Sequence, residues 1–193
     1  MIWVGILHIL NKNIIKNKFD KIYINIINNI NIYMSTELIS EQILDEEIFL
    51  DSSDINDEIN DILTIKLKDK LEGRCINSGF IIKNSIIIIN RSLHGRCVGN
   101  NKIMYNIKFK TRIVSPILGS IISCYINNVT KAGVVAYIKL SDYDGLEGHL
   151  FTDSPLKILI PIKRFENTDI NTGSKINIMI TAKRIKYKNT TIQ

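Results

Sequence analysis

Two isoleucine-rich runs that lie close together constrain the fold of this chain most. Residues 80–82 and 86–89 are apolar, and the polar residues Lys83, Asn84 and Ser85 separate them. Turn-forming residues between two β-branched runs predict two strands joined by a tight hairpin. Four consecutive isoleucines do not alternate with polar residues, so we expect the second strand to be covered on both faces.

A helix and a long strand are predicted on either side of these runs. Residues 51–54 offer N-cap candidates, and apolar residues then recur at helical spacing from residue 55 to residue 67. Residues 103–112 alternate strictly between apolar and polar side chains, which predicts a strand. The polar face of that strand carries Lys108, Lys110 and Arg112, which either meet phosphate or face solvent.

The charge of the chain is distributed unevenly. The net charge is +6, yet residues 34–65 hold ten acids and no base, whereas residues 66–112 hold eleven bases and two acids. A basic body suggests a partner that is phosphate-rich or acidic. The alternative is codon bias, because 42 isoleucines, 21 asparagines and 19 lysines are typical of an A/T-rich genome.

No catalytic or metal-binding constellation is evident. The three cysteines are far apart and the three histidines have no ligand spacing, which argues against a disulfide framework and structural zinc and favours reduced surroundings. Asp142, Asp144 and Glu147 cluster on a glycine-bearing polar stretch that is typical of a solvated loop. We therefore expect no metal, no cofactor and no enzymatic activity.

The beginning of the chain differs from the rest. Its first apolar stretch is too short to span a bilayer, and Met34 opens an ordinary-looking protein start. We expect residues 1–45 to be a disordered or mis-assigned extension. An amphipathic, membrane-touching helix within residues 1–33 is the alternative.

The last third of the chain predicts a small β-barrel. Five strand-like segments recur with turn signals between them, at residues 120–127, 133–140, 156–160, 175–182 and 183–187. This spacing suits a five-stranded OB-fold barrel, which binds single strands by stacking bases on aromatic side chains in a basic groove. The aromatic candidates are Tyr125, Tyr137 and Phe151. The basic residues expected around them are Lys131, Lys157, Lys183, Arg184 and Lys186.

Several short motifs occur in a familiar order. They are Glu-Gly-Arg-Cys at residues 72–75, Gly-Phe-Ile at 79–81, Tyr-x-Ile-x-Phe at 105–109, the stretch from Pro to Ile at 116–122 and Val-Thr-Lys-Ala-Gly-Val-Val-Ala at 129–136. In order and spacing they resemble the seventh-subunit (stalk) family of DNA-dependent RNA polymerases. The residue bias and the Pro-Leu-Lys-Ile-Leu-Ile-Pro strand resemble the versions of large cytoplasmic DNA viruses.

The resemblance implies an α+β fold. A small helix-plus-antiparallel-sheet domain at residues 46–114 would dock on the polymerase, and a five-stranded OB-fold domain at 115–193 would bind nucleic acid. One departure concerns Val134, because cellular members usually carry an aromatic residue after the glycine matched by Gly133. This departure weakens the expected base stacking at that position.

The resemblance also implies a function. The protein would be an accessory, non-catalytic subunit of a viral DNA-dependent RNA polymerase, present in the virion and the host cytoplasm. It would dock on the large subunits and on a fourth-subunit-like partner and contact nascent single-stranded RNA, with no membrane involved. The matched docking residues are Glu72, Gly73, Gly79 and Phe80. The alternative is a stand-alone OB-fold RNA-binding protein such as a translation-factor mimic; an enzyme such as a nuclease subunit would need a site that the sequence lacks.

Overall fold

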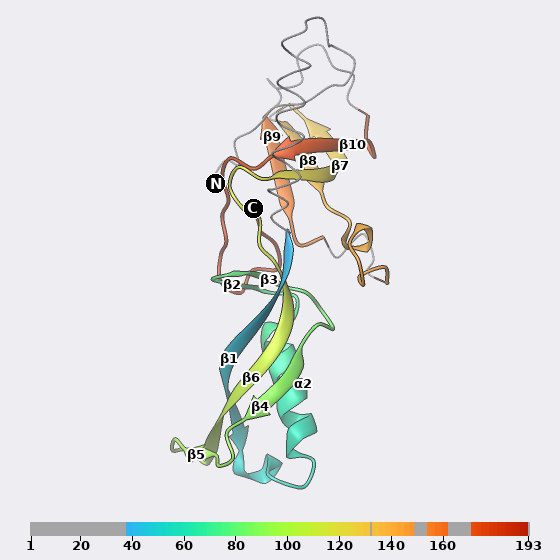
Figure 1. The fold of residues 1–193 in the computed structure, drawn as a ribbon. Helices are drawn as coiled ribbons and strands as arrows, with labels where there is room; N and C mark the ends of the chain where they lie inside the picture. The colour runs from blue at the N-terminus through green and yellow to red at the C-terminus, as the bar shows by residue number, and fades with distance from the viewer. Residues whose placement is uncertain (1–37, 132, 149–153, 162–170, 193) are drawn as a thin grey trace, which may run out of the picture. The chain divides into compact units, whose positions relative to one another are not determined.

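The computed structural model describes residues 38–131, 133–148, 154–161 and 171–192 (Figure 1), so most of the predicted extension lies outside the described residues. These residues form mostly antiparallel sheets in two compact units. The N-terminal unit comprises residues 39–115 and 185–190, and the C-terminal unit comprises the described residues of 116–184 together with 38, 191 and 192. The N-terminal unit thus begins ahead of residue 46, where we expected its domain to begin.

Two long strands form the centre of the N-terminal unit. Strand β1 (Ile39–Asp51) pairs antiparallel with β6 (Lys102–Val114) along its whole length. The alternating pattern of residues 103–112 is confirmed by β6. Shorter strands pair along the other edge of β6, with β2 pairing to β3. They are β2 (Cys75–Ile76), β3 (Gly79–Ile81), β4 (Ile87–Arg91) and β5 (Arg96–Cys97).

One face of this sheet packs on helix α2 (Ile59–Leu71), as Figure 1 shows. Leu63 and Leu67 of the helix are fully buried against Ile107 and Phe109 of β6. The apolar residues of the helix therefore form the core of the unit, because a helix buries its apolar stripe against a sheet face.

The helix begins later than the sequence predicted. Residues 51–54 end β1 and form the short 3₁₀ turn η1 (Ser52–Asp54), and the N-cap of α2 is Glu58. The Ser52 N–H donates to the carbonyl oxygen of Asn101 at 3.0 Å, so this segment bonds to the turn between β5 and β6 and is not the start of the helix. Gly73, at φ +70°, follows the C-cap residue, and the left-handed backbone there ends the helix.

The predicted hairpin between the two isoleucine runs is wrong. Strands β3 and β4 do not pair with each other; both pair antiparallel with β6. Between them Asn84 adopts φ 58°, and the Ser85 hydroxyl lies 2.7 Å from the Thr111 hydroxyl of β6. The polar residues 83–85 therefore form a short loop between two strands that both pair with β6, because β6 is long enough to pair with both. The tight hairpin joins β2 and β3 instead.

The expected burial of β4 on both faces is also wrong. Ile86 is buried, but Ile87 and Ile89 are 63% and 50% exposed. Helix α2 covers only one face of the sheet, and the pairing of β4 with β6 is irregular between Ile88 and Asn90. The isoleucine run therefore contributes to both the core and the face opposite α2, which no described element covers and which we call the uncovered face.

The C-terminal unit is a curled four-stranded antiparallel sheet, a half-barrel, in the order β10–β7–β8–β9. Its strands confirm four of the five predicted segments. They are β7 (Ile121–Thr130), β8 (Gly133–Tyr137), β9 (Lys157–Pro161) and β10 (Lys175–Met179). Alternate residues, such as Cys124 and Ile126 of β7 and Val134 and Ala136 of β8, are buried on one face.

The fifth predicted strand, at residues 183–187, is not a strand. Residues 185–190 belong to the N-terminal unit, where the Cys75 N–H donates to the Asn189 carbonyl oxygen and the Lys188 N–H donates to the Cys75 carbonyl oxygen. The chain then returns to the C-terminal unit, where Ile192 forms a parallel bridge with Leu156. Pairing with Cys75 thus replaces the predicted barrel strand.

Candidate nucleic-acid interface

Four side chains form one row across the half-barrel sheet. The strand register pairs Lys175 of β10 with Tyr125 of β7, Tyr125 with Tyr137 of β8, and Tyr137 with Lys157 of β9. Directly opposed residues in antiparallel strands project from the same face. Since Cys124 and its alternate neighbours occupy the buried face, this Lys–Tyr–Tyr–Lys row lies on the outer face of the sheet.

The two tyrosines of the row stack on each other. Their ring centroids are 5.8 Å apart and the ring planes differ by 28°. Both rings are half-buried, so the pair forms a partly exposed aromatic surface. Such a surface is the type of platform on which nucleic-acid bases stack.

Ammonium groups surround the Tyr125 end of the row. The Lys139 Nζ lies 4.2 Å from the centroid of the Tyr125 ring, and the Lys175 Nζ lies 5.4 Å from it. Both distances are within the range of a cation–π contact. The row therefore combines aromatic surface with positive charge.

One acid also meets the row. Asp142 ends the short 3₁₀ helix η2 (Leu140–Asp142), and its Oδ2 accepts a hydrogen bond from the Tyr125 hydroxyl at 2.7 Å and one from the Lys175 Nζ at 3.4 Å. Hydrogen bonding to Tyr125 and then to Asp142 raises the pKa of Lys175 above its usual value. The sequence predicted a solvated acidic loop around residues 142–147, but Asp142 of that loop is hydrogen-bonded to Tyr125 and Lys175 of the row.

The structure brings together only some of the predicted nucleic-acid residues. Tyr137 and Lys157 are neighbours, and Tyr125 adjoins them. Lys131 lies at the β7–β8 turn, just beyond the end of β7, and that end is about 16 Å along the strand from Tyr125 at ~3.3 Å per residue. Phe151 lies outside the described residues.

The three basic residues after β10 take other positions. The Lys183 Nζ donates to the carbonyl oxygen of Pro116 at 3.0 Å, and Arg184 is half-buried. Lys186 is exposed and belongs to the segment in the N-terminal unit. None of these contacts joins them to the tyrosine row.

Three residues of the site were missed by sequence reasoning: Lys139, Asp142 and Lys175. Lys139 follows Tyr137 by two positions, so the period of a strand could have indicated that it shares a face with the tyrosine. Lys175 is far from Tyr125 in sequence, and only the strand register brings the two together. No local signal in the sequence reports that register.

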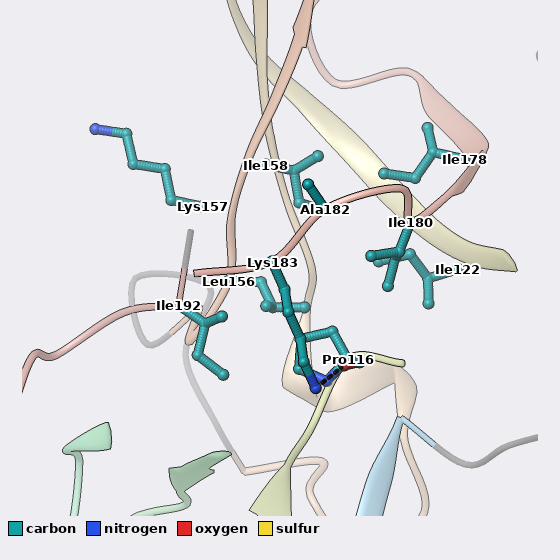
Figure 2. Close-up of a pocket in the computed structure, with 10 residues that line it drawn as sticks. All are labelled: Pro116, Ile122, Leu156, Lys157, Ile158, Ile178, Ile180, Ala182, Lys183 and Ile192. Atoms are coloured by element: carbon teal, nitrogen blue, oxygen red, sulfur yellow. Dashed lines mark hydrogen bonds between the residues drawn. The ribbon is translucent and has the colours of Figure 1, made fainter. Parts of the chain in front are cut away.

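A small apolar cavity lies within the C-terminal unit (Figure 2). Its volume is about 20 Å³, enough for roughly one water molecule. In Figure 2 the Lys183 ammonium reaches the Pro116 carbonyl, whereas the Lys157 ammonium points away from the cavity. The cavity is therefore a packing space of the half-barrel core, and it is smaller than a ligand pocket.

The predicted docking residues build the β2–β3 hairpin and the end of α2. Gly73 and Phe80 are buried, and a Cβ at Gly79 would lie 2.4 Å from the carbonyl oxygen of Val114. The Glu72 carboxylate accepts a hydrogen bond from the Ile86 N–H at 3.3 Å. These residues hold the local backbone in place.

The basic residues of β6 lie opposite acids of β1. Lys108 is paired in the register with Asp45 and Arg112 with Glu41, while the Lys110 ammonium lies 2.7 Å from the Glu41 carboxylate. The acidic and basic stretches of the sequence thus meet across the sheet, where opposite charges stabilise cross-strand pairs. This pairing reduces the positive potential that the β6 face could offer to phosphate.

The same uncovered face exposes large apolar side chains. Ile43 and Ile87 flank Lys110 in the register and are 59% and 63% exposed. Phe49, opposite Met104, is 44% exposed. Apolar side chains that gather on one face are typical of protein interaction surfaces.

The two buried cysteines are poor nucleophiles. Burial raises the pKa of the Cys75 thiol to about 11 and that of Cys124 to about 12, which suppresses their thiolate forms. Across the described ranges, no three His, Cys, Asp or Glu side chains gather in a way that could hold a metal ion. Within the same part of the chain, no helix has the length and apolar character needed to cross a membrane.

Neither a protein-family model nor a curated protein matches the chain.

Proposed function

We propose that this protein is an accessory, non-catalytic subunit of a viral DNA-dependent RNA polymerase whose C-terminal unit contacts nascent RNA. The observation that supports RNA contact best is the Lys175–Tyr125–Tyr137–Lys157 row on the outer face of the half-barrel. Stacked aromatic rings bind bases without sequence preference, and flanking lysines neutralise the backbone phosphates. A subunit that meets every transcript needs binding of this sequence-tolerant kind.

The strand arrangement supports an OB-fold assignment for the C-terminal unit. Strands β7, β8 and β9 pair consecutively, and β10 pairs with the other edge of β7. The parallel bridge between Leu156 and Ile192 lies next to β9, at the edge where a fifth strand would close the barrel. A partly open five-stranded barrel is the form that OB folds take.

The uncovered sheet face of the N-terminal unit is the surface that we propose for docking on the polymerase. It presents Ile43, Phe49 and Ile87 among paired charges. The matched residues Glu72, Gly73, Gly79 and Phe80 would act indirectly, by holding the hairpin and the helix end that support this sheet. The large polymerase subunits and a fourth-subunit-like protein are the proposed partners, in the virion and the host cytoplasm.

Co-purification tests this proposal directly. A tagged copy of the full chain, expressed in infected cells, is expected to recover the two large polymerase subunits in stoichiometric amounts. An Ile43→Asp, Ile87→Asp double variant should lose them, whereas Ile65→Asp, on the exposed side of α2, should retain them. Recovery of the chain as a free monomer would contradict the polymerase assignment.

A stand-alone RNA-binding protein is the second candidate, because the tyrosine row needs no polymerase in order to bind RNA. This function predicts salt-sensitive RNA binding by the isolated chain together with a negative co-purification. The slope of log affinity against log salt would then report the number of phosphates engaged.

A further inference from the structure

A carboxylate at one end of the proposed phosphate-binding row requires an explanation. Asp142 is exposed, so burial does not force it into this contact. Its Oδ2 accepts hydrogen bonds from the Tyr125 hydroxyl and the Lys175 Nζ, and the Lys139 Nζ also lies against the Tyr125 ring. One anionic oxygen thus occupies the centre of the donors that the row offers.

A backbone phosphate would use the same donors. Tyrosine hydroxyls and lysine ammonium groups are common phosphate contacts in nucleic-acid complexes. Since the carboxylate and a phosphate are both negative, the two cannot share Tyr125 and Lys175 without repulsion. Binding of a phosphate at this position therefore requires that Asp142 leave.

We propose that Asp142 is an internal competitor for phosphate at the Tyr125 end of the row. This inference rests on the proposed RNA contact and adds a residue that limits its strength. While Asp142 is bound to Lys175, a phosphate must compete with its carboxylate for that ammonium group. A nucleic acid that displaces the carboxylate gains Lys175 as a further phosphate contact.

The exchange is easy because the groups are exposed. The side chains of Lys175 and Asp142 are 53% and 34% exposed, and ion pairs between exposed groups contribute little net stability. Asp142 therefore weakens RNA binding without abolishing it.

The test compares Asp142→Asn with the parent and with Asp57→Asn. Asp57 is an exposed acid of the N-terminal unit, so its substitution makes the same change in net charge in the unit that does not carry the row. The full-length variants are titrated against a labelled oligouridylate of about ten nucleotides, within the site sizes known for OB folds. Fluorescence anisotropy is recorded from about 50 to 200 mM salt, the range over which phosphate contacts change affinity strongly.

Asp142→Asn is expected to bind about three- to tenfold more tightly than the parent, from the removal of one weak ion pair and one repulsion. Its salt dependence should be steeper by about 0.7 in slope, the value for one added phosphate contact on a single strand. Asp57→Asn should bind like the parent. Lys175→Gln should have little effect in the parent but should remove most of the gain in the Asp142→Asn background.

The remaining outcomes count against the inference in distinguishable ways. If the parent binds and Asp142→Asn binds equally or more weakly, Asp142 is no competitor while the proposed RNA contact stands. An equal gain in Asp57→Asn would assign the effect to net charge alone. If neither the parent nor Asp142→Asn binds, the RNA contact fails and the competitor role fails with it. Circular dichroism of each variant confirms that the titrations compare folded proteins.

Discussion

Replacing Tyr137 by alanine tests the aromatic platform most directly. The Tyr137 ring stacks on Tyr125 with centroids 5.8 Å apart and lies next to Lys157 in the register. We expect one base to stack on this ring, and loss of a base–aromatic stack costs about 1–3 kcal/mol. At 1.4 kcal/mol per factor of ten, the dissociation constant should rise about 5- to 150-fold. Anisotropy titration of the full chain with oligouridylate measures this change.

Two controls separate the loss of stacking from other effects. Tyr137→Phe keeps the ring and should bind within about threefold of the parent, because stacking does not need the hydroxyl. Tyr187→Ala removes an exposed tyrosine of the N-terminal unit and should leave RNA affinity unchanged. The alanine variant also loses the contact with Tyr125, worth about 0.5–1.5 kcal/mol of stability, so its melting temperature must be recorded. Parent-like RNA binding by folded Tyr137→Ala would refute the platform.

Three further predictions concern stability and reactivity. Leu67→Ala should destabilise the N-terminal unit by about 2–5 kcal/mol in chemical unfolding because the side chain is fully buried, whereas exposed Ile65→Ala should change stability by less than about 0.5 kcal/mol. Gly133→Ala should lower the melting temperature, since its Cβ would lie 2.5 Å from a carbonyl oxygen of β9, and Gly148→Ala, with no atom within 4 Å, should not. At pH 8 exposed Cys97 should be alkylated first, and the two buried cysteines should react only on unfolding. Because their folded pKa values are raised, their contribution to stability is present below about pH 9 and declines as the pH rises toward 11 and 12.

Local patterns in the sequence predicted the strands that depend on local properties. The alternation of residues 103–112 predicted β6 with one buried and one exposed face, and the turn signals of the C-terminal third predicted the separate strands β7 to β10. The hairpin of residues 80–89 was predicted wrongly because pairing depends on what else is available. The long strand β6 accepts β3 and β4 in succession, and nothing within residues 80–89 reports the length of that partner.

The same distinction applies to the candidate site. Tyr137 and Lys157 were predicted because each lies in a strand-like segment with suitable chemistry. Lys175 and Asp142 were missed because they reach Tyr125 only through the register of β10 and the path of η2. Lys183 was included for its charge, yet its ammonium is bonded to the Pro116 carbonyl. Charge in a sequence therefore shows which residues can bind phosphate, and only pairing shows which are available.

The two basic regions of the chain, β6 and the tyrosine row, also differ in how far acids compensate their positive charges. Lys102, Lys108 and Arg112 of β6 lie opposite acids of β1, and the Lys110 ammonium pairs with Glu41, so the positive charge of that surface is largely compensated despite the basic sequence. In the tyrosine row Asp142 bonds to Lys175, while Lys139 lies over the Tyr125 ring and Lys157 lies opposite Tyr137, and Asp142 is exposed. Under the proposed function, a transcript that moves past the subunit must be released at every step, which favours contacts that exchange easily. A stacked tyrosine pair with exposed lysines and an internal carboxylate meets that requirement, whereas a deep, strongly basic groove would retain the RNA.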